Sequence, residues 1–575
     1  MRNYYQTLSK FFDIITPKQK REYWMYCFLF VIASILETLG ISLIFILLNL
    51  ILLEKSTITF SIIDINLKDI NQNYESIILS SIIFLYFIKS VFLSFFYWSQ
   101  NKFVFDLEKD LAERLFYGYL LSPLKFHLNT NTSELIRNIT VETGQLSGGI
   151  LTNSLLFFKN FFLFIFLFIF LLNINFKITL SVFAILLVLG LLYQQIMTKK
   201  NSKWGKERQI QVGWRIRNLQ EAFQGIKTIK IFKKEIFFFK RILPVLERIN
   251  LIRLFQTFFK NLPRIWFEFF AVLGLVVLII YYQKGNNEFI NIIPTLGVLS
   301  LVLVRLLPTI TSMLNNFQHM DYSSASVIKI KNDLQYFQKN QIERNEISIK
   351  FQNKIEFKDV TFKYSESSKD VLKKINLEIK KFQSIGIYGK SGAGKSTILN
   401  LILGLLNPTS GTIKIDGHIL KQGNGSITSL FSYVPQDIFL IDESIKKNII
   451  LEDIKDGKFD KKLNSAIEKS ELYHLIKSLK NKENTLTGEL GGSLSGGEKQ
   501  RIAIARALFK DSEVLVFDEA TKSLDQFNQD QINKLIQTFM KKKTIINVTH
   551  DLDSLKGYDV IYKIENGNLE KIIKD

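Results

Sequence analysis

The segment SIGIYGKSGAGKSTILNLILGLL, residues 384–406, decides the fold of the C-terminal part of this chain. An apolar run leads into a glycine-rich loop, and a helical apolar pattern follows it. Within it, GKSGAGKST (Gly389–Thr397) matches the phosphate-binding loop G-x-x-x-x-G-K-[ST] in the strand, loop and helix context that this loop requires. Glycines let backbone N–H groups approach phosphate oxygens, and the helix N-terminus adds positive potential. The segment therefore predicts an α/β nucleotide-binding domain.

Two further stretches supply groups that such a site needs. VLVFDE (Val514–Glu519) has the pattern of a buried parallel strand that ends in two carboxylates. We expect Asp518 to help hold Mg²⁺ and Glu519 to polarise the attacking water. We expect Lys395 to meet the β- and γ-phosphates and Ser396 to offer its hydroxyl to Mg²⁺. The predicted ATP-binding residues of the loop are Gly389, Lys390, Ser391, Gly392, Ala393, Gly394, Lys395, Ser396 and Thr397.

An aromatic residue precedes the loop by one strand. Tyr364 ends the strand-like stretch IEFKDVTFKY (Ile355–Tyr364). It can stack on an adenine ring, although an isolated strand tyrosine usually only packs against its neighbours. We therefore take Tyr364 as a candidate ATP contact.

Most of the chain before residue 315 is apolar. Hydrophobic residues make up 47% of the 575 residues, which is unusual for a wholly soluble protein. A bilayer core needs about 20 mostly apolar residues in a helix. Six stretches meet this requirement: Tyr23–Leu53, Ser76–Trp98, Ile150–Leu172, Ile178–Met197, Ile265–Tyr282 and Ile292–Leu314. The sequence thus predicts an all-α transmembrane domain of six helices in front of the nucleotide-binding domain.

The net charge of +21 follows from the predicted topology. Basic residues crowd two long polar helical stretches, Asn101–Gly144 and Lys199–Lys260, which the positive-inside rule puts in the cytoplasm. The short connection Asn173–Lys177 then faces outward, and both termini are cytoplasmic. We expect no nucleic-acid partner, because aromatic-interleaved basic patches are absent. The outer loop Glu54–Tyr74 is predicted to be either a short amphipathic helix on the outer leaflet or a partly buried loop.

Ionisable residues inside the predicted spans are informative because they are costly in hydrocarbon. They are Glu37, Lys89, Glu268 and Arg305, with Arg264 just outside the fifth span. Such groups face one another, the protein interior or a water-filled cavity. An acid would pair with a nearby base simply to hold the bundle together. The excess of bases would instead suit an anionic substrate group such as phosphate or pyrophosphate, with Lys89, Arg264 and Arg305 as the cavity candidates.

One motif makes a family resemblance specific. LSGGEKQR (Leu494–Arg501) resembles the signature of ATP-binding cassette (ABC) ATPases, which other phosphate-loop families lack. The resemblance implies that the signature closes over the γ-phosphate bound to the opposite subunit. It also implies a Mg²⁺-contacting glutamine, a γ-phosphate-sensing histidine, a dimer-facing loop and a segment that contacts the intracellular loops. The matching positions are Ser495, Gly496 and Gly497 in the signature, then Gln436, His550, Ser523-Leu524-Asp525 and TGELGG (Thr487–Gly492).

The chain departs from the family pattern at several positions. Glu498 stands where glutamine is usual, and Lys522 stands where serine is common. His550 is followed by Asp551-Leu552 in place of the frequent Arg-Leu. No catalytic group is lost, so we expect a competent site. Lys522 puts the rate and the dimer contacts in doubt.

The resemblance covers the whole chain, which is similar to the half-transporters of the ABC exporters. It implies a transmembrane domain at 1–330, a linker at 331–350 and an ATPase domain at 351–575. ETLGISL (Glu37–Leu43) and LPRIWFE (Leu262–Glu268), together with VRLLPT at 304–309, look most like bacterial flippases for lipid-linked oligosaccharides. These likenesses imply ATP-driven movement of such a lipid, or a related anionic amphiphile, across the bacterial inner membrane.

The resemblance leaves alternatives open. The partner is either a second copy of the chain or a related half-transporter, so both a homodimer and a heterodimer are compatible with it. The cargo is either a lipid-linked oligosaccharide or another lipid, a peptide or a drug. A soluble cassette protein acting in translation or repair is disfavoured by the six spans.

Overall fold

The computed structural model describes residues 2–53, 57–60, 63–66, 74–174, 176–283, 289–340, 351–364, 369–420, 425–452, 459–521 and 526–572. The chain forms two compact units. One comprises Met1–Ser122 and Thr130–Asn340, and the other comprises Pro123–Asn129 and Gln341–Asp575. The last long helix of the first unit ends at Lys339, so residues 331–339 of the predicted linker are helical.

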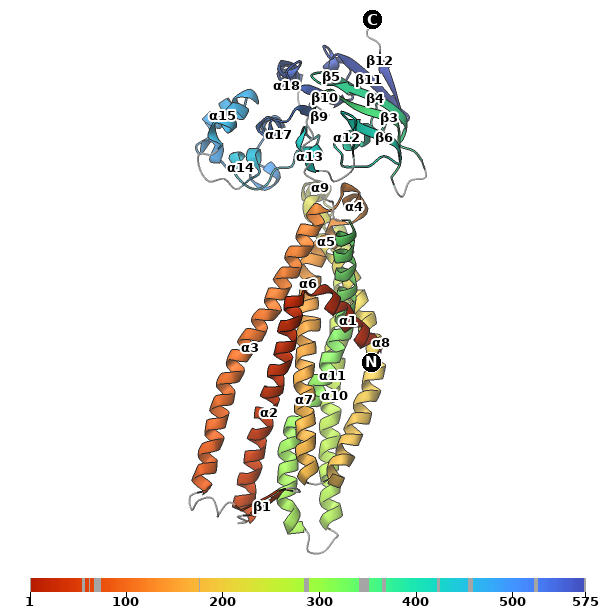
Figure 1. Ribbon diagram of the computed structural model, residues 1–575. Coiled ribbons are helices and arrows are strands. Elements are labelled where there is room, and N and C mark those ends of the chain that lie inside the picture. Colours follow the sequence, from red (N-terminus) through yellow and green to blue (C-terminus); the bar gives the residue numbers. More distant parts are fainter. Residues whose placement is uncertain are drawn as a thin grey trace. The chain divides into compact units, whose positions relative to one another are not determined.

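Long helices build the N-terminal unit (Figure 1). They are α2 (Pro17–Leu53), α3 (Tyr74–Leu121), α7 (Asn153–Ile174), α8 (Phe176–Gln224), α10 (Glu235–Gln283) and α11 (Phe289–Lys339). Each predicted span falls on one of these helices, except that the third begins in the π-helical turn before α7. Among the residues described, three helical stretches are long and apolar enough to cross a membrane: Pro17–Gly40, Leu79–Leu121 and Thr132–Asn173.

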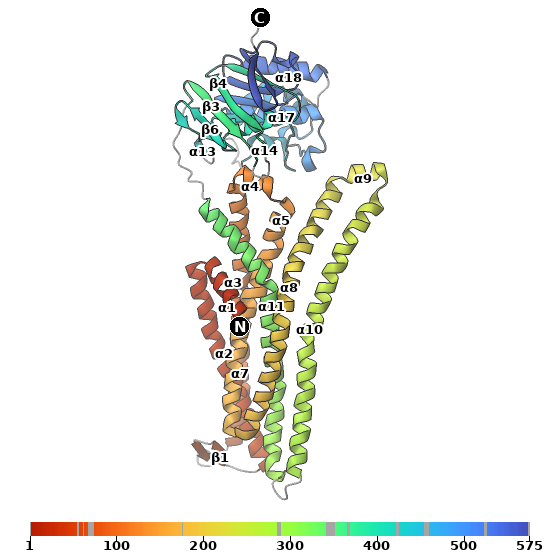
Figure 2. The ribbon, with the colours of Figure 1, turned by 90° about the vertical axis from the view of Figure 1, so that its right-hand side faces the viewer.

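Short helical elements join the long ones. They are α1 (Arg2–Ile14), α5 (Thr132–Arg137), α6 (Thr143–Leu146), α9 (Ile226–Phe232) and the π-helical η2 (Asn138–Glu142) and η3 (Ser147–Thr152). The predicted polar helix Asn101–Gly144 is interrupted where α3 ends at Leu121, because Pro123 disfavours helical backbone in the residue before it. The following α4 (Leu124–Asn129) belongs to the C-terminal unit. Figure 2 shows α9 joining the ends of α8 and α10.

The outer loop differs from the amphipathic helix expected as one of its two forms. Its described residues form an antiparallel hairpin of β1 (Thr57–Phe60) and β2 (Ile63–Asn66), in which Thr57 pairs with Asn66 and Phe60 with Ile63. The helical alternative is therefore wrong for these residues, and the partly buried loop stays a prediction. The physical reason is local, because TITF and IDIN are rich in β-branched side chains, which favour extended backbone.

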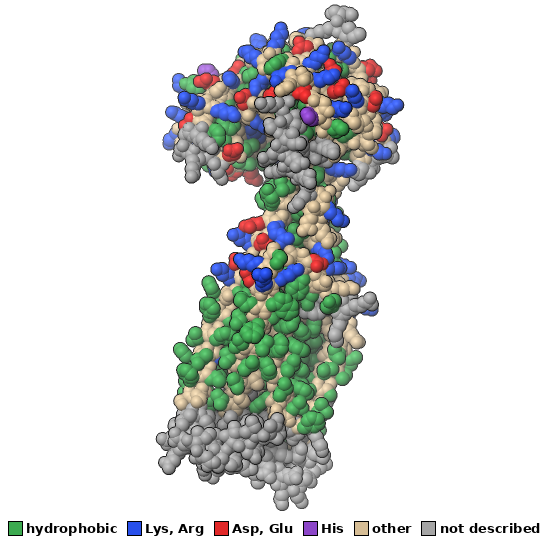
Figure 3. All heavy atoms as spheres, in the orientation of Figure 1, with side chains coloured by type: hydrophobic (Ala, Val, Ile, Leu, Met, Phe, Trp, Pro, Cys, Tyr) green, Lys and Arg blue, Asp and Glu red, His purple; other side chains and the backbone are tan. Residues whose placement is uncertain are grey.

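Apolar side chains cover the long helices. Figure 3 shows hydrophobic side chains spread over the middle of the N-terminal unit, and charged side chains gathered toward one end of it. On α3, Ile83 is 71% exposed and Phe87 is 66% exposed. Exposed apolar surface on helices that are long enough to cross a bilayer indicates a lipid-facing region.

Two sheets form the base of the C-terminal unit. The larger has the order β12-β11-β5-β10-β9-β8, and its strands are parallel except for the edge strand β12. The smaller is antiparallel with the order β4-β3-β6-β7. The strands are β3 (Lys354–Phe362), β4 (Leu372–Lys380), β5 (Ser384–Tyr388), β6 (Ser410–Ile415), β7 (His418–Ile419), β8 (Phe431–Val434), β9 (Val514–Asp518), β10 (Thr544–Thr549), β11 (Val560–Glu565) and β12 (Asn568–Ile572).

Helices pack around these sheets. They are α12 (Lys395–Ile402), α13 (Gly425–Ser429), α14 (Ile445–Ile450), α15 (Asp460–Lys469), α16 (Tyr473–Ser478), α17 (Gly496–Lys510), α18 (Gln526–Phe539) and the 3₁₀ turns η4 (Lys482–Asn484), η5 (Glu489–Gly491) and η6 (Asp553–Leu555). A single buried core joins both sheets to α12, with Ile387, Ile398 and Val548 fully buried in it. The predicted fold class, a helical membrane domain plus an α/β phosphate-loop domain, is confirmed.

Candidate functional site

The phosphate-binding loop connects β5 to α12 at the carboxyl end of the parallel strands. In open α/β sheets, ligands bind at this end. A Cβ atom at Gly389 would lie 2.6 Å from the backbone oxygen of Ile564, so only glycine fits there. Gly394 has φ of 107° and forms the N-cap of α12, which again requires glycine. The loop is thus shaped by glycines at the two positions where the backbone must turn or approach closely.

The loop lysine is held inside the site. Lys395 is buried, and its Nζ atom donates to the backbone oxygens of Gly389 at 2.8 Å and Lys390 at 3.2 Å. The same atom lies 3.1 Å from Oε1 of Glu519, which is also buried. Lys395 and Glu519 are thus each other's counter-ions in a buried ion pair.

Glu519 follows the last residue of β9 in an uncommon backbone conformation, with φ of 46°. Its amide donates to the backbone oxygen of Val548 on β10 at 2.8 Å, which holds the turn at the end of the two strands. His550 is half exposed, and its Nδ1 atom lies 3.9 Å from Oε2 of Glu519. The structure therefore brings Lys395, Glu519 and His550 together from three separate elements.

Asp518 has a partner that the sequence analysis missed. The hydroxyl of Tyr433 on β8 donates to Oδ2 of Asp518 at 3.0 Å. Partial burial, and then the neighbouring Asp518 carboxylate, raise the pKa of Tyr433, so the phenol remains a donor. In the parallel register Val434 pairs with Phe517, so Asp518 at the end of β9 and Gln436 just after β8 lie at the same edge of the sheet. Tyr433 stands three residues before Gln436 in the sequence, and nothing in the local pattern pointed to its contact with Asp518.

Two other predicted contacts lie near α12. The hydroxyl of Tyr364 is 3.2 Å from Oγ1 of Thr397, and its ring packs edge-on against Phe362 at a centroid distance of 5.0 Å. Ser396 is exposed at the first turn of the helix. Both hydroxyls therefore lie beside the phosphate-binding loop, and the stacking of Tyr364 on adenine and the Mg²⁺ contact of Ser396 stay predictions.

The signature serine begins α17. Its Oγ accepts from the amide of Glu498 at 3.3 Å, and the amide of Ser495 donates to the Glu498 carboxylate at 2.6 Å. This reciprocal pair is a capping box, in which either Glu or Gln can occupy the third helical position. The departure from the family pattern at Glu498 thus has a structural role. Gly496 and Gly497 form the first turn.

The segment before the signature is fixed from within the unit. Thr487 is fully buried, and its hydroxyl donates to the backbone oxygens of Ile441 at 2.9 Å and Glu443 at 3.1 Å. Asn448 on α14 adds a bond to the same hydroxyl at 3.3 Å. The TGELGG segment therefore has a defined position beside the loop that follows Gln436. The other predicted loop residues, Ser523-Leu524-Asp525, and the departure at Lys522 lie outside the described residues.

In the membrane unit, charged groups from separate helices gather around one carboxylate. Glu37 on α2 is 3% exposed, and its carboxylate lies 2.5 Å from Arg305 on α11 and 3.8 Å from Lys159 on α7. Lys89 on α3 interacts electrostatically with these same three residues. We call Glu37, Lys89, Lys159 and Arg305 the Glu37 cluster. Pairing of Glu37 with a base, one of the two roles considered for it, is therefore seen.

The structure brings together only part of the predicted cavity set. Lys89 and Arg305 belong to the Glu37 cluster, whereas Arg264 is exposed on α10 and has no contact with the cluster among the described residues. The cluster also includes Lys159, which the sequence analysis missed. Lys159 lies in NSLLFFKNFF, where one lysine in a phenylalanine run was the available signal. Its Nζ atom also donates to the hydroxyl of Tyr97 at 2.7 Å.

Two family models match most of this chain. The model described as ABC transporter transmembrane region matches residues 7–282, and the model described as ABC transporter matches residues 372–522. The chain belongs to the ABC transporters. It combines a membrane domain and an ATPase domain of that family in one polypeptide, so it is a half-transporter whose ATPase activity is coupled to transport.

Relatives agree with this family. The ATP-dependent lipid A-core flippase of Pseudoalteromonas translucida (strain TAC 125) is 27% identical over 479 residues, which cover 80% of this chain and 79% of that protein. A putative multidrug export ATP-binding/permease protein of Staphylococcus aureus (strain NCTC 8325 / PS 47) is 36% identical over 238 residues, 41% of each chain. Among solved structures, a bacterial Atm1-family ABC exporter with ATP bound has a TM-score of 0.78 over 97% of this chain at 19% identity, which supports the fold.

Proposed function

We propose that this ABC transporter is a flippase that moves a lipid-linked oligosaccharide, or a related anionic amphiphile, across the bacterial inner membrane. The observation that carries this proposal is the Glu37 cluster. It holds two cations, Lys159 and Arg305, in ion pairs with one carboxylate inside the membrane unit, and a third cation, Lys89, is near enough to interact electrostatically with all three groups. An excess of positive charge is costly in hydrocarbon, so ionisable residues inside membrane spans are candidates for a substrate site.

The geometry of the cluster favours a phosphate-bearing ligand. Arg305 is 46% exposed, so its guanidinium can reach a ligand while one edge remains near Glu37. A guanidinium matches phosphate oxygens bidentately, and lysines add point charges beside it. Phosphate or pyrophosphate would replace Glu37 as the counter-ion, while an apolar lipid tail remains in the bilayer. The flippase relatives support a lipid cargo.

At the ATP site, the residues present fit Mg²⁺ and nucleotide. Asp518 and the exposed Ser396 supply oxygen donors, and Gln436 follows the neighbouring strand, which suits a hard cation. When bound, Mg²⁺ neutralises charge on the phosphates. Lys395 would exchange Glu519 for phosphate oxygens, and this frees the Glu519 carboxylate to accept a proton from the attacking water. His550 would then contact the γ-phosphate from the other side of Glu519.

We further propose that two copies of the chain assemble. One copy supplies one phosphate loop and one signature, and each site of an ABC dimer needs both, from different subunits. The end of the α8–α10 hairpin supports assembly, because Phe223, Phe232 and Phe237 are 70%, 66% and 59% exposed in a single chain. A second copy would cover these side chains, and C₂ symmetry is the commonest solution. Basic cytoplasmic stretches orient the ATPase domain toward the cytoplasm.

A flipping assay tests the cargo. The protein is reconstituted in liposomes with a fluorescent polyprenyl-pyrophosphate glycan, and wild type is compared with a variant in which Lys89, Arg264 and Arg305 become Gln. The variant should lose most flipping while basal ATPase remains largely intact. The matched control neutralises three exposed cytoplasmic lysines, Lys206, Lys227 and Lys240, and should flip normally.

Either of two results would overturn the glycolipid proposal. One is undiminished flipping by the membrane-charge variant. The other is no flipping by wild type together with vigorous export of an uncharged compound, which would favour the multidrug function named for the Staphylococcus aureus relative. Restoring Arg264 alone separates its contribution from that of the Glu37 cluster.

A further inference from the structure

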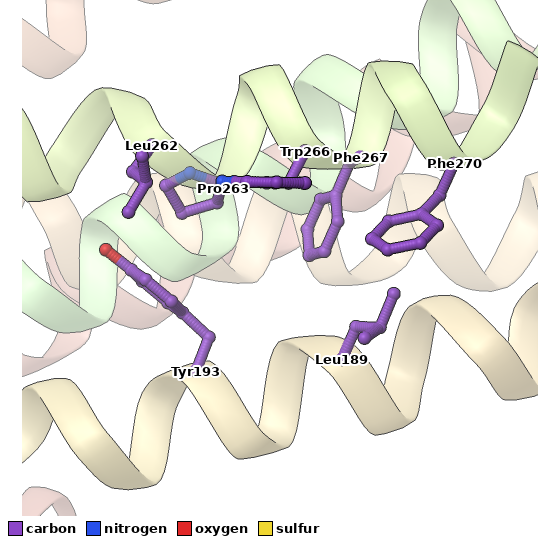
Figure 4. Close-up of a pocket in the computed structure, with 7 residues that line it drawn as sticks. All are labelled: Leu189, Tyr193, Leu262, Pro263, Trp266, Phe267 and Phe270. Atoms are coloured by element: carbon purple, nitrogen blue, oxygen red, sulfur yellow. The ribbon is translucent and has the colours of Figure 1, made fainter.

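A pocket lies between α8 and α10 in the membrane unit (Figure 4). It has a volume of about 270 Å³ and is lined by Leu189, Tyr193, Leu262, Pro263, Trp266, Phe267 and Phe270. All of these side chains are apolar or aromatic, and their polar groups are the hydroxyl of Tyr193 and the indole N–H of Trp266. The residues belong to predicted spans or to the turn just before one. Because α8 runs toward the cytoplasm and α10 away from it, the pocket lies in the cytoplasmic half of those spans.

The pocket is a built feature of the helix pair. Pro263 lies inside α10 and has no backbone N–H, so it cannot donate to the backbone oxygen of Phe259, four residues earlier. The hydroxyl of Tyr193 on α8 donates to that oxygen instead. An unsatisfied carbonyl in a bilayer costs several kcal/mol, so this bond holds Tyr193 across the gap. Figure 4 shows the Tyr193 ring reaching from α8 toward Leu262 and Pro263.

Positive charge and aromatic rings border the cytoplasmic end of this pocket. Lys200 on α8 lies 5.2 Å from the centroid of the Phe259 ring. Trp204 stacks on the same ring at 5.8 Å, one helical turn farther along α8. Lys260 follows Phe259 directly and is half-buried. The acid next along α8, Glu207, is paired with Arg248. Lysines with aromatic rings at a span end are typical of the level of lipid headgroups.

We propose that this pocket holds an acyl chain of an anionic phospholipid of the cytoplasmic leaflet, with its phosphate at Lys200 and Lys260. Trp266 is six residues from Lys260, a rise of about 9 Å along the helix, so one lipid can reach both. Basic sites between membrane helices on the cytoplasmic side recognise anionic headgroups. The inference concerns a lipid of the surrounding membrane and does not rest on the identity of the cargo.

Fluorescence quenching at Trp266 tests this site directly. The full-length protein is placed in nanodiscs that contain a low mole fraction of phosphatidylglycerol or phosphatidylcholine with brominated chains. The difference between wild type and Trp266→Phe isolates the quenching of that tryptophan. We expect phosphatidylglycerol to quench at a roughly tenfold lower mole fraction than phosphatidylcholine, because two lysines face its phosphate. Equal quenching by both lipids would overturn the proposal, since it describes ordinary boundary lipid.

Two double variants test whether the two lysines recognise the headgroup. The double variant Lys200→Gln/Lys260→Gln should lose the preference for phosphatidylglycerol. Its matched control, Lys206→Gln/Lys240→Gln, changes the same helices farther from the span and should keep the preference. If both double variants behave alike, the headgroup assignment is wrong.

The pocket itself is tested by filling it. Leu189→Trp adds a large ring to the pocket wall, and native mass spectrometry should then detect fewer retained phosphatidylglycerol molecules. Leu187→Trp is the control, because Leu187 is 53% exposed on the same helix and outside the pocket. Unchanged lipid retention by Leu189→Trp would show that the acyl chain binds elsewhere.

Discussion

The Nζ atom of Lys395 lies 3.1 Å from Oε1 of Glu519, and both side chains are buried. We expect Lys395 to meet the phosphates of ATP and Glu519 to serve the attacking water. If they do so, the phosphates compete with Glu519 for Lys395. We therefore propose that ATP binding and activation of the base are coupled through this ion pair.

The first prediction concerns Glu519→Gln. We expect hydrolysis to fall on the order of 10²–10⁴-fold, because the water loses its base. ATP binding should be retained or tightened, because Lys395 no longer has to leave a carboxylate. Steady-state ATPase and equilibrium binding of a fluorescent ATP analogue measure the two effects. Glu513→Gln is the control and should change neither, because Glu513 is a partly buried carboxylate paired with Lys381. ATPase near the wild-type rate would refute the assignment of the base.

The second prediction concerns sharing of sites between subunits. Lys395→Ala removes the charge that meets the phosphates, and Ser495→Arg places a bulky cation where the signature must close. Each variant alone should be inactive. A mixture should recover part of the ATPase activity, because a mixed dimer has one site with an intact loop from one chain and an intact signature from the other. Hydrolysis by monomers at the dimer rate per chain would contradict shared sites.

A control for the second prediction isolates folding. Ser495 caps α17, and replacing a capping serine with alanine costs about 0.5–2 kcal/mol of stability. Ser495→Ala removes the cap without the bulk and should retain more activity than Ser495→Arg. Thermal unfolding of wild type, Ser495→Ala and Ser495→Arg shows whether loss of the cap accounts for the loss of ATPase activity.

The third prediction concerns Tyr433→Phe. Tyr433→Phe removes the hydrogen bond to Asp518. The Mg²⁺ concentration needed for half-maximal ATPase activity should therefore rise about two- to tenfold, which corresponds to one ordinary hydrogen bond. A titration with Mg²⁺ at saturating ATP measures the change, and Tyr562→Phe on β11 is the control. An identical Mg²⁺ titration for wild type and Tyr433→Phe would show that the bond does not position Asp518.

The pH dependence of this bond follows from its donor. Partial burial and Asp518 raise the pKa of Tyr433, so the fold favours the neutral phenol. The stabilisation is complete below the unfolded pKa of about 10 and is lost as pH rises through the higher folded pKa. The difference in the free energy of unfolding between wild type and Tyr433→Phe should therefore be constant between about pH 7 and 9. A difference that disappears within this range would contradict the donor role.

The fourth prediction concerns Glu37→Gln. Lys159 would lose its buried counter-ion, so we expect the stability of the fold to fall by an amount on the order of 1–3 kcal/mol. The loss should be smaller than for a fully buried ion pair, because Arg305 is half exposed. Thermal unfolding in detergent measures the loss. The double variant Glu37→Gln/Lys159→Gln should recover part of it, since the unpaired charge is gone. No recovery would mean that Glu37 acts through other contacts.

Much of this protein could be predicted from short segments of its sequence. The phosphate loop, the VLVFDE strand and the signature each encode their own local structure, because glycine positions, a buried run and a capping box act within a few residues. The long apolar stretches likewise predicted the membrane helices. The helical alternative for the outer loop was wrong, because its few apolar residues fit a helix face while their β-branched side chains favoured the hairpin of β1 and β2.

The tertiary structure alone decided which of these residues meet. Tyr433 finds Asp518 because β8 and β9 are neighbours in a parallel sheet, although 85 positions separate the two residues. Lys395 and Glu519 come from separate strand ends, and Glu37 finds Lys159 and Arg305 on two other helices. Local sequence fixes backbone conformation because its energy depends on adjacent residues. The pairing of distant charges depends on packing over the whole fold, and a short stretch of sequence does not encode it.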